Sequence, residues 1–70
     1  MTITIEAQKI NGYLIEIYQS KYGSGYNVAA YPQHDGNLYG YPTTDLHYAT
    51  RPQAQRRYRY LIQRAERNEL

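Results

Sequence analysis

The chain contains no cysteine, tryptophan or phenylalanine and only one methionine. The absence of cysteine excludes disulfide bridges and thiolate metal sites. It also suits a reducing compartment, so we expect a cytoplasmic protein. The apolar runs are too short for a transmembrane helix or the core of a signal peptide. We therefore expect no membrane partner.

The chain is short and nearly balanced in charge, with 70 residues and a net charge of +2. This length predicts a single small domain spanning residues 1–70. The charge is unevenly distributed, because residues 1–50 are mildly acidic whereas residues 51–70 carry all six arginines. Such asymmetry indicates an anionic partner for the C-terminal segment.

Alternating apolar and polar residues predict a first strand from Thr2 and a returning strand over residues 13–18, joined at Asn11-Gly12. Two registers compete at this hairpin. A two-residue loop of Asn11 and Gly12 would divide the isoleucines between the two faces of the sheet. Because one slipped residue moves a whole face, the hydrophobic pattern should decide the register.

This pattern favours a three-residue loop, residues 10–12, with a bulge and a left-handed Gly12. This register is unfavourable in one respect, because it places two like charges opposite each other on the solvent-exposed face of the sheet. It predicts three cross-strand pairs: Ile5 with Ile17, Ala7 with Ile15, and Glu6 with Glu16.

Shorter strands are predicted in the middle of the chain. Residues 26–31 alternate again, and Pro32 should end that strand or place it at an edge. Residues 38–41 form a further short strand, and residues 45–49 either extend it or form a fifth one. The sheet should therefore occupy about residues 2–49.

The C-terminal segment predicts an amphipathic helix over about residues 51–68. Thr50 and Gln53 have the spacing of a capping box, and Pro52 falls in the first turn. One apolar stripe follows, made of Ala54, Tyr58, Leu61, Ile62 and Ala65. The predicted fold class is therefore α+β, with an antiparallel sheet of three to five strands, built from N-terminal hairpins and packed by one C-terminal α-helix.

The candidate binding residues lie on the side of this helix away from the stripe and on its two flanks, with Arg57 and Arg64 on one flank and Arg59 on the other. Guanidinium groups form bidentate hydrogen bonds with phosphates and carboxylates and stack on planar rings. An exposed tyrosine among them can stack on a base or fill a pocket of a partner. The alternative interpretation is a solvated face on which Tyr60 stacks against its own arginines. The candidate residues are Arg56, Arg57, Arg59, Tyr60, Arg64 and Arg67.

Other chemistry is weakly indicated. Asp45 and His47 have a spacing that places both side chains on one face of a strand, and His34-Asp35 lies at a turn. Such a set could bind a metal ion or pair as a base and its orienting group. However, an aspartate before glycine is ordinary turn chemistry. We therefore expect no catalytic residues, no metal site and no cofactor.

One stretch resembles a known family. Residues 25–28, read as Gly-Tyr-Asn-Val, together with Pro32 and Gly36, are similar to the sheet of HicB-type antitoxin domains. Those domains continue into a helix rich in small and acidic residues, whereas the helix here is rich in arginine. The resemblance therefore implies a small sheet and assigns no functional residues.

Three classes of function follow from these features. The ten tyrosines, each with an apolar body and a polar tip, suit an interface or a half-exposed sheet. We expect a small non-enzymatic protein-interaction or regulatory module whose partner is another protein or a second copy of the chain. The alternative is a nucleic-acid-binding module that uses the arginine-rich helix, although a net charge of +2 is small for that role. An enzyme is least favoured, because no nucleophile–base set appears in the sequence.

Overall fold

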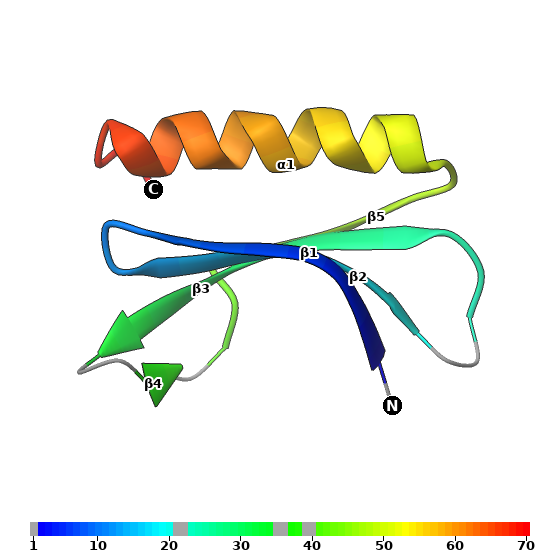
Figure 1. Ribbon diagram of the computed structural model, residues 1–70, viewed down its shortest axis with the longest axis horizontal. Coiled ribbons are helices and arrows are strands. Elements are labelled where there is room, and N and C mark those ends of the chain that lie inside the picture. Colours follow the sequence, from blue (N-terminus) through cyan, green and yellow to red (C-terminus); the bar gives the residue numbers. More distant parts are fainter. Residues whose placement is uncertain (1, 21–22, 35–36, 39–40) are drawn as a thin grey trace.

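The computed structural model describes residues 2–20, 23–34, 37–38 and 41–70. In this part of the chain, strands are followed by one C-terminal helix that lies along one face of an antiparallel sheet (Figure 1). The predicted α+β architecture is confirmed. The elements are β1 (Thr2–Ile10), β2 (Tyr13–Ser20), β3 (Tyr26–His34), β4 (Asn37–Leu38), β5 (Thr44–Tyr48) and α1 (Arg51–Glu66).

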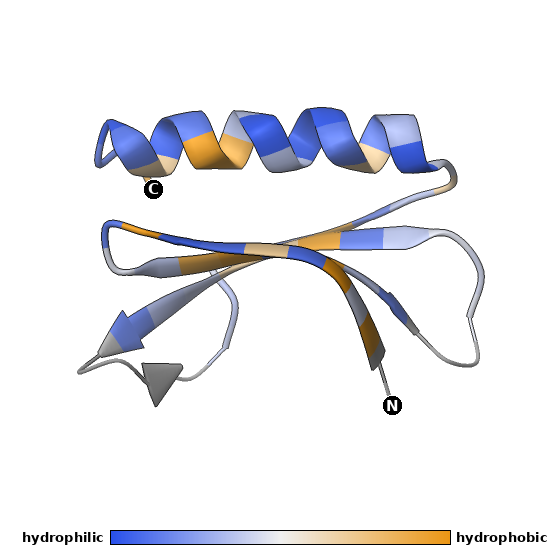
Figure 2. Ribbon diagram, in the orientation of Figure 1, coloured by the Kyte–Doolittle hydropathy of each residue, from blue (hydrophilic) through white to orange (hydrophobic). Residues whose placement is uncertain are grey.

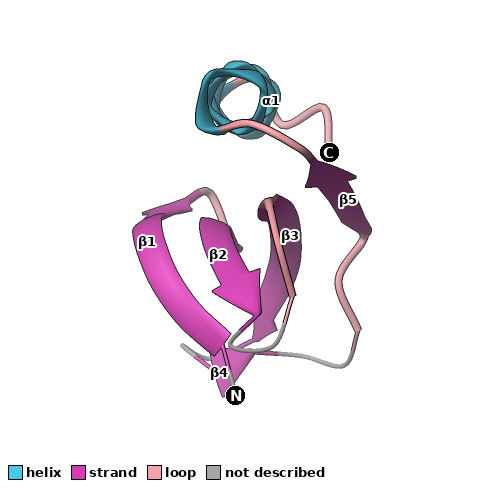
Figure 3. Cartoon of the chain, turned by 90° about the vertical axis from the view of Figure 1, so that its right-hand side faces the viewer, coloured by secondary structure: helices cyan, strands magenta, loops and turns pink. Residues whose placement is uncertain are grey.

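The long strand β3 organises the sheet. It pairs with β2 on one side and with β5 on the other, while β4 pairs only with its end (Figure 3). The fifth strand is therefore a separate element, which decides between the two predicted alternatives for residues 45–49. Of the predicted strand at residues 38–41, Leu38 belongs to β4 and Tyr41 lies in a bend. Residues 39–40 lie outside the described residues.

The loop predicted for the first hairpin is wrong. Ile10 pairs with Tyr13, so Asn11 and Gly12 alone form the turn, with φ values of 47° and 83°. This two-residue turn needs positive φ at both central positions, and asparagine followed by glycine meets that need better than most pairs. The preference of the turn therefore outweighs the hydrophobic pattern near the loop.

A bulge in β1 allows the two-residue turn to form without moving Ile5 away from the core. Near the turn, Ala7 pairs with Glu16 and Glu6 pairs with Ile17, but the register shifts by one residue between Thr4 and Glu6. The predicted pairs of Ile5, Ala7 and Glu6 are all wrong. The extra residue at the bulge lets Ile5 still pack against the core. The two glutamates also avoid each other, because Glu6 and Glu16 lie on opposite faces.

Pro32 lies inside β3 and does not end it. Ala30 accepts a hydrogen bond from the backbone N–H of Thr43 (2.8 Å), whereas Gln33 donates to Gly12 (2.8 Å) on the β2 side. By alternation, the nitrogen of Pro32 faces the β5 side, where pairing has already ended at Ala30. Among the described residues, Pro32 therefore lies between the β5 and β4 pairings and removes no ladder hydrogen bond, as expected for a proline in a strand.

The core lies between one face of the sheet and the apolar stripe of α1, and α1 is hydrophilic elsewhere (Figure 2). Ile62 is partly buried and packs against this core, so the predicted phase of the helix is confirmed. The buried residues of this core are Ile15, Ile17, Val28, Ala30, Ala54, Tyr58, Leu61 and Ala65.

The helix begins where the sequence predicts, but without a capping box. Thr50 is the N-cap residue, yet its side chain makes no capping hydrogen bond. Pro52 in the first turn has no N–H to satisfy, so fewer donors need a cap. The Gln53 side chain lines a hollow beside α1.

The helix ends at Glu66, two residues before the predicted end. Asn68 adopts a left-handed conformation (φ 56°) and donates to the carbonyl of Ala65 (3.1 Å), while Glu69 donates to that of Arg64 (2.8 Å). These two bonds form a Schellman motif with asparagine in the left-handed position. From the sheet, Asn11 Nδ2 also donates to the Ala65 carbonyl (2.9 Å). The first hairpin and the last turn of α1 are thus joined.

Candidate functional site

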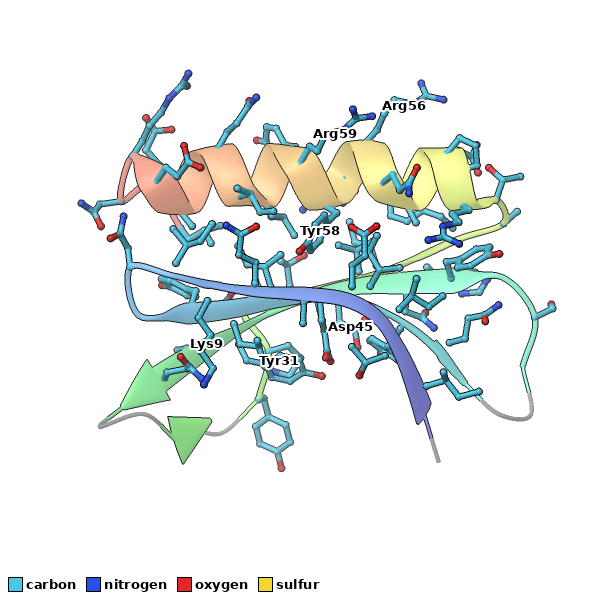
Figure 4. The ribbon with its side chains drawn as sticks, viewed as in Figure 1. Lys9, Tyr31, Asp45, Arg56, Tyr58 and Arg59 are labelled. Atoms are coloured by element: carbon cyan, nitrogen blue, oxygen red, sulfur yellow. The ribbon has the colours of Figure 1, made fainter. Side chains whose placement is uncertain are left out.

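The predicted binding residues occupy more than one side of α1. Arg56 and Arg59 are exposed and point away from the sheet, whereas Tyr58 points into the core (Figure 4). Arg67 is the C-cap residue and is also exposed. Arg57 and Arg64 are only partly exposed and lie on the side nearest β5. The structure therefore brings together only some of the six candidates.

The group that does come together is an aromatic ring between two guanidinium groups. The Cζ atoms of Arg57 and Arg64 lie 5.1 and 5.6 Å from the centroid of the Tyr60 ring. Arg64 Nη1 also donates a hydrogen bond to Tyr60 Oη (2.7 Å). This bond raises the pKa of Arg64, which stays charged. Tyr60 remains 43% exposed, so the ring is held in place and still accessible.

Contacts outside the helix fix both arginines. Arg57 Nη2 donates to Thr44 Oγ1 of β5 (3.3 Å), and Arg64 Nη2 donates to the carbonyl of Glu69 (2.7 Å). The Nε atom of Arg57 is buried without a hydrogen-bond partner. This burial shows that the guanidinium of Arg57 is held against the protein and is not freely solvated.

Two adjacent hollows lie along the seam between α1 and β5, and Arg57 and Tyr60 line both. The larger, of ≈ 390 Å³, is open and is completed by Tyr48, Gln53 and Arg56. The smaller, of ≈ 220 Å³, reaches toward the C-terminal end of the helix. We call the two hollows together the α1–β5 groove. The residues that line it are Thr43, Thr44, Tyr48, Gln53, Arg56, Arg57, Tyr60, Leu61, Arg64, Glu69 and Leu70.

The opposite side of α1 has a different character. Arg51 lies 3.9 Å from Glu6 of β1 in a half-exposed ion pair. A small hollow lies next to this pair and is lined by Glu6, Tyr58 and Arg59, among others. Burial, and then the charge of Glu6, raises the pKa of Tyr58. Arg59 therefore belongs to the β1 side of the helix and does not contribute to the α1–β5 groove.

The face of the sheet away from α1 carries an acidic cluster that was not predicted from the sequence. Glu16 and Asp45 each pair with Ala29, so the two carboxylates flank one alanine. Asp45 accepts a hydrogen bond from Tyr18 Oη at 2.7 Å (Oδ2) and 3.0 Å (Oδ1). Tyr31 and Lys9 lie on the same face (Figure 4). Only the pairing of β2, β3 and β5 could have revealed this cluster in advance.

Burial and negative charge shift the ionisation of this cluster. Burial, followed by the charge of Asp45, raises the pKa of Glu16. Burial, followed by the hydrogen bond to Asp45, raises the pKa of Tyr18. Burial, with the charges of Glu16 and Asp45, likewise raises the pKa of Tyr31. Both phenols therefore remain protonated at neutral pH.

The aspartate and histidine considered as a pair do share this face, but they bind different neighbours. Asp45 is bonded to Tyr18, whereas His47 Nδ1 lies 3.0 Å from Asn27 Oδ1. Asp35 lies outside the described residues, and His34 is described only as the last residue of β3. Within the described chain, no three histidine, aspartate or glutamate side chains gather as a metal site would require.

Comparisons with protein-family models, curated proteins and solved structures find no match to this chain. Among the residues that the structure describes, no helix has the length and apolar character needed to cross a membrane.

Proposed function

We propose that the protein is a non-enzymatic protein-interaction module that binds an acidic partner at the α1–β5 groove. The observation that supports this proposal is the stack of Arg57, Tyr60 and Arg64. Tyrosine and arginine are among the residue types that most often dominate the binding energy of interfaces. Because both guanidinium groups are already held by other contacts, binding would cost little additional side-chain entropy.

The charges of the groove favour an acidic partner, because three arginines line it against one glutamate, Glu69. Among the described residues, Arg51 is the only arginine that has a carboxylate as an ion-pair partner. Within the described chain, the exposed guanidinium of Arg56 therefore has no carboxylate partner to leave before it binds another protein. Charge complementarity of this kind increases association rates and rejects basic partners.

Nucleic acid is the second candidate, because Tyr48 and Tyr60 line the groove together with Arg56 and Arg57. An unpaired base could stack on a tyrosine ring while the guanidinium groups bind the phosphates. The acidic cluster on the opposite face and the small net charge make this candidate second.

Two experiments separate these candidates. In the first experiment, fragments that bind the native protein are selected from a phage-displayed library of protein domains. These fragments should lose most of their affinity for a Tyr60→Ala variant. They should keep their affinity for Lys9→Ala, a control change on the opposite face of the sheet. Amide-resolved NMR with a pool of RNA and DNA oligonucleotides should show no salt-sensitive shifts along α1. Such shifts would establish the nucleic-acid candidate instead, because phosphate binding weakens steeply as salt rises. Equal binding of the fragments to both variants would contradict the proposed groove.

A further inference from the structure

The strand β5 forms an outer edge of the sheet next to the α1–β5 groove. Within the described chain, β5 pairs with β3 alone. Ala30 pairs with Thr44 and accepts a hydrogen bond from Thr43, so the even-numbered residues of β5 direct their backbone groups toward β3. By alternation, the N–H and C=O groups of Asp45 and His47 point outward. An outer edge of this kind is a template for another strand.

The same strand directs alternate side chains toward the helix. Thr44 binds Arg57, Tyr48 lines the larger hollow, and Leu46 between them is 44% exposed. A strand added beside β5 would therefore run along α1. Every second side chain of that strand would face the groove with its arginines and Tyr60, as expected for the two-residue period of a strand.

We propose that the occupant of the groove is an extended acidic peptide segment of the partner, added to the outer edge of β5 as a further strand. This inference rests on the proposed function and names the form of the partner. Backbone hydrogen bonds to β5 would supply affinity, and the α1–β5 groove would select alternate side chains.

The charges on the two faces of the sheet predict the sequence pattern of the peptide. Side chains that face α1 meet Arg56 and Arg57, so acidic or aromatic residues are expected at alternate positions. Side chains on the other face approach Asp45, whose carboxylate already accepts two contacts from Tyr18. Acidic residues should be rare at these intervening positions, because like charges on neighbouring strands repel.

The other outer strand is less suited to this role. Within the described chain, β1 pairs with β2 alone, and its register shifts between Thr4 and Glu6. A bulge twists an edge and protects it from further pairing. The pairing of β5 with β3 runs through five residue pairs without a shift. The edge beside the groove is therefore the regular one.

A random peptide library displayed on phage, selected against the full chain, tests the inference. Enriched peptides should carry acids at alternate positions. Methylation of single backbone nitrogens should weaken binding about tenfold or more at alternate positions and little at the intervening ones. Arg56→Gln should weaken binding about tenfold, whereas Arg59→Gln, a matched change on the β1 side of the helix, should leave it within about twofold.

The outcomes distinguish the inference from the proposed function. If no peptide is enriched, or if backbone methylation is tolerated throughout, strand addition is wrong, while folded fragments that depend on Tyr60 would still support the proposed function. If the enriched peptides bind the Tyr60→Ala variant as well as the native protein, both are wrong. Equal losses with Arg56→Gln and Arg59→Gln would show a general attraction to the helix and would also overturn strand addition.

Discussion

Asn11 joins the first turn of the sheet to the last turn of the helix, and its two roles can be separated by substitution. Its backbone adopts φ 47° in the two-residue turn. Its side chain donates to the carbonyls of Ala65 (2.9 Å) and Glu66 (3.4 Å). Asn11→Gly keeps the left-handed backbone and removes the side-chain bonds, whereas Asn11→Ala disturbs both.

The two variants should differ by a measurable amount. A hydrogen bond contributes about 0.5–1.5 kcal/mol to stability, and we expect Asn11→Gly to lose about that much, since the second contact is long. A left-handed backbone costs alanine about 1–2 kcal/mol, a cost that asparagine largely avoids, so Asn11→Ala should lose about 1.5–3.5 kcal/mol. A domain of this size has only about 3–5 kcal/mol of stability, so both losses are large.

Urea denaturation followed by circular dichroism measures these differences in the free energy of unfolding. We expect the order native, Asn11→Gly, Asn11→Ala, from most to least stable. If Asn11→Gly matches the native protein, the bond to Ala65 contributes nothing. If the two variants are equally unstable, the left-handed backbone at residue 11 does not contribute the expected ~1–2 kcal/mol.

Other substitutions test the packing and the charges. Leu61→Ala removes a side chain that is 1% exposed and should lower the free energy of unfolding by about 2–5 kcal/mol. Tyr60→Ala should change this free energy little. A large loss of stability with Tyr60→Ala would contradict the orientation of α1. Gly25→Ala should lower the melting temperature much more than Gly12→Ala. Both glycines have positive φ, but of the two only Gly25 would place an added Cβ against a backbone oxygen, that of Tyr48, at 2.6 Å. The raised pKa of Glu16 means that the folded state favours the neutral form of this side chain. The resulting contribution to the free energy of unfolding is present below the ordinary pKa of 4.5 and is lost as the pH rises through the raised pKa. Glu16→Gln should therefore stabilise the protein at pH 7 but not at about pH 3.5, and an equal effect at both would show that the charge is not responsible.

The helix was predictable from the sequence because its signal is local. The apolar stripe from Ala54 to Ala65 repeats over several turns, and it correctly predicted the buried face of the helix, of which Ile62 is a partly buried member. The same phase placed Arg57 and Arg64 on the opposite side from Arg59. The capping box was wrong because a residue spacing does not show whether the side chain of Thr50 turns toward the helix.

The register of the first hairpin was not predictable, because two local preferences disagreed. The Asn11-Gly12 turn favoured one register and the isoleucines favoured another, and the bulge in β1 satisfies each preference in its own half of the hairpin. A pattern that assumes one register along the whole strand cannot produce this result.

The seam beside β5 and the acidic cluster were not predictable either, because both depend on pairing between distant strands. Glu16 and Asp45 approach one another only because β2 and β5 lie on opposite sides of β3. Tyr48 meets Arg56 in one hollow for a similar reason. Six arginines identified the helix as a candidate surface, but the partner strand that completes the groove was not identifiable from them.

The most direct test of the proposed interaction surface is an amide-resolved NMR titration of the full chain with the most enriched acidic peptide. We expect shifts confined to residues 45–47 of β5 and residues 53–60 of α1, with Glu16 and Tyr31 on the opposite face unchanged. Shifts concentrated on Glu16 and Tyr31 would place the interaction on the other face of the sheet and would contradict a binding site at the α1–β5 groove.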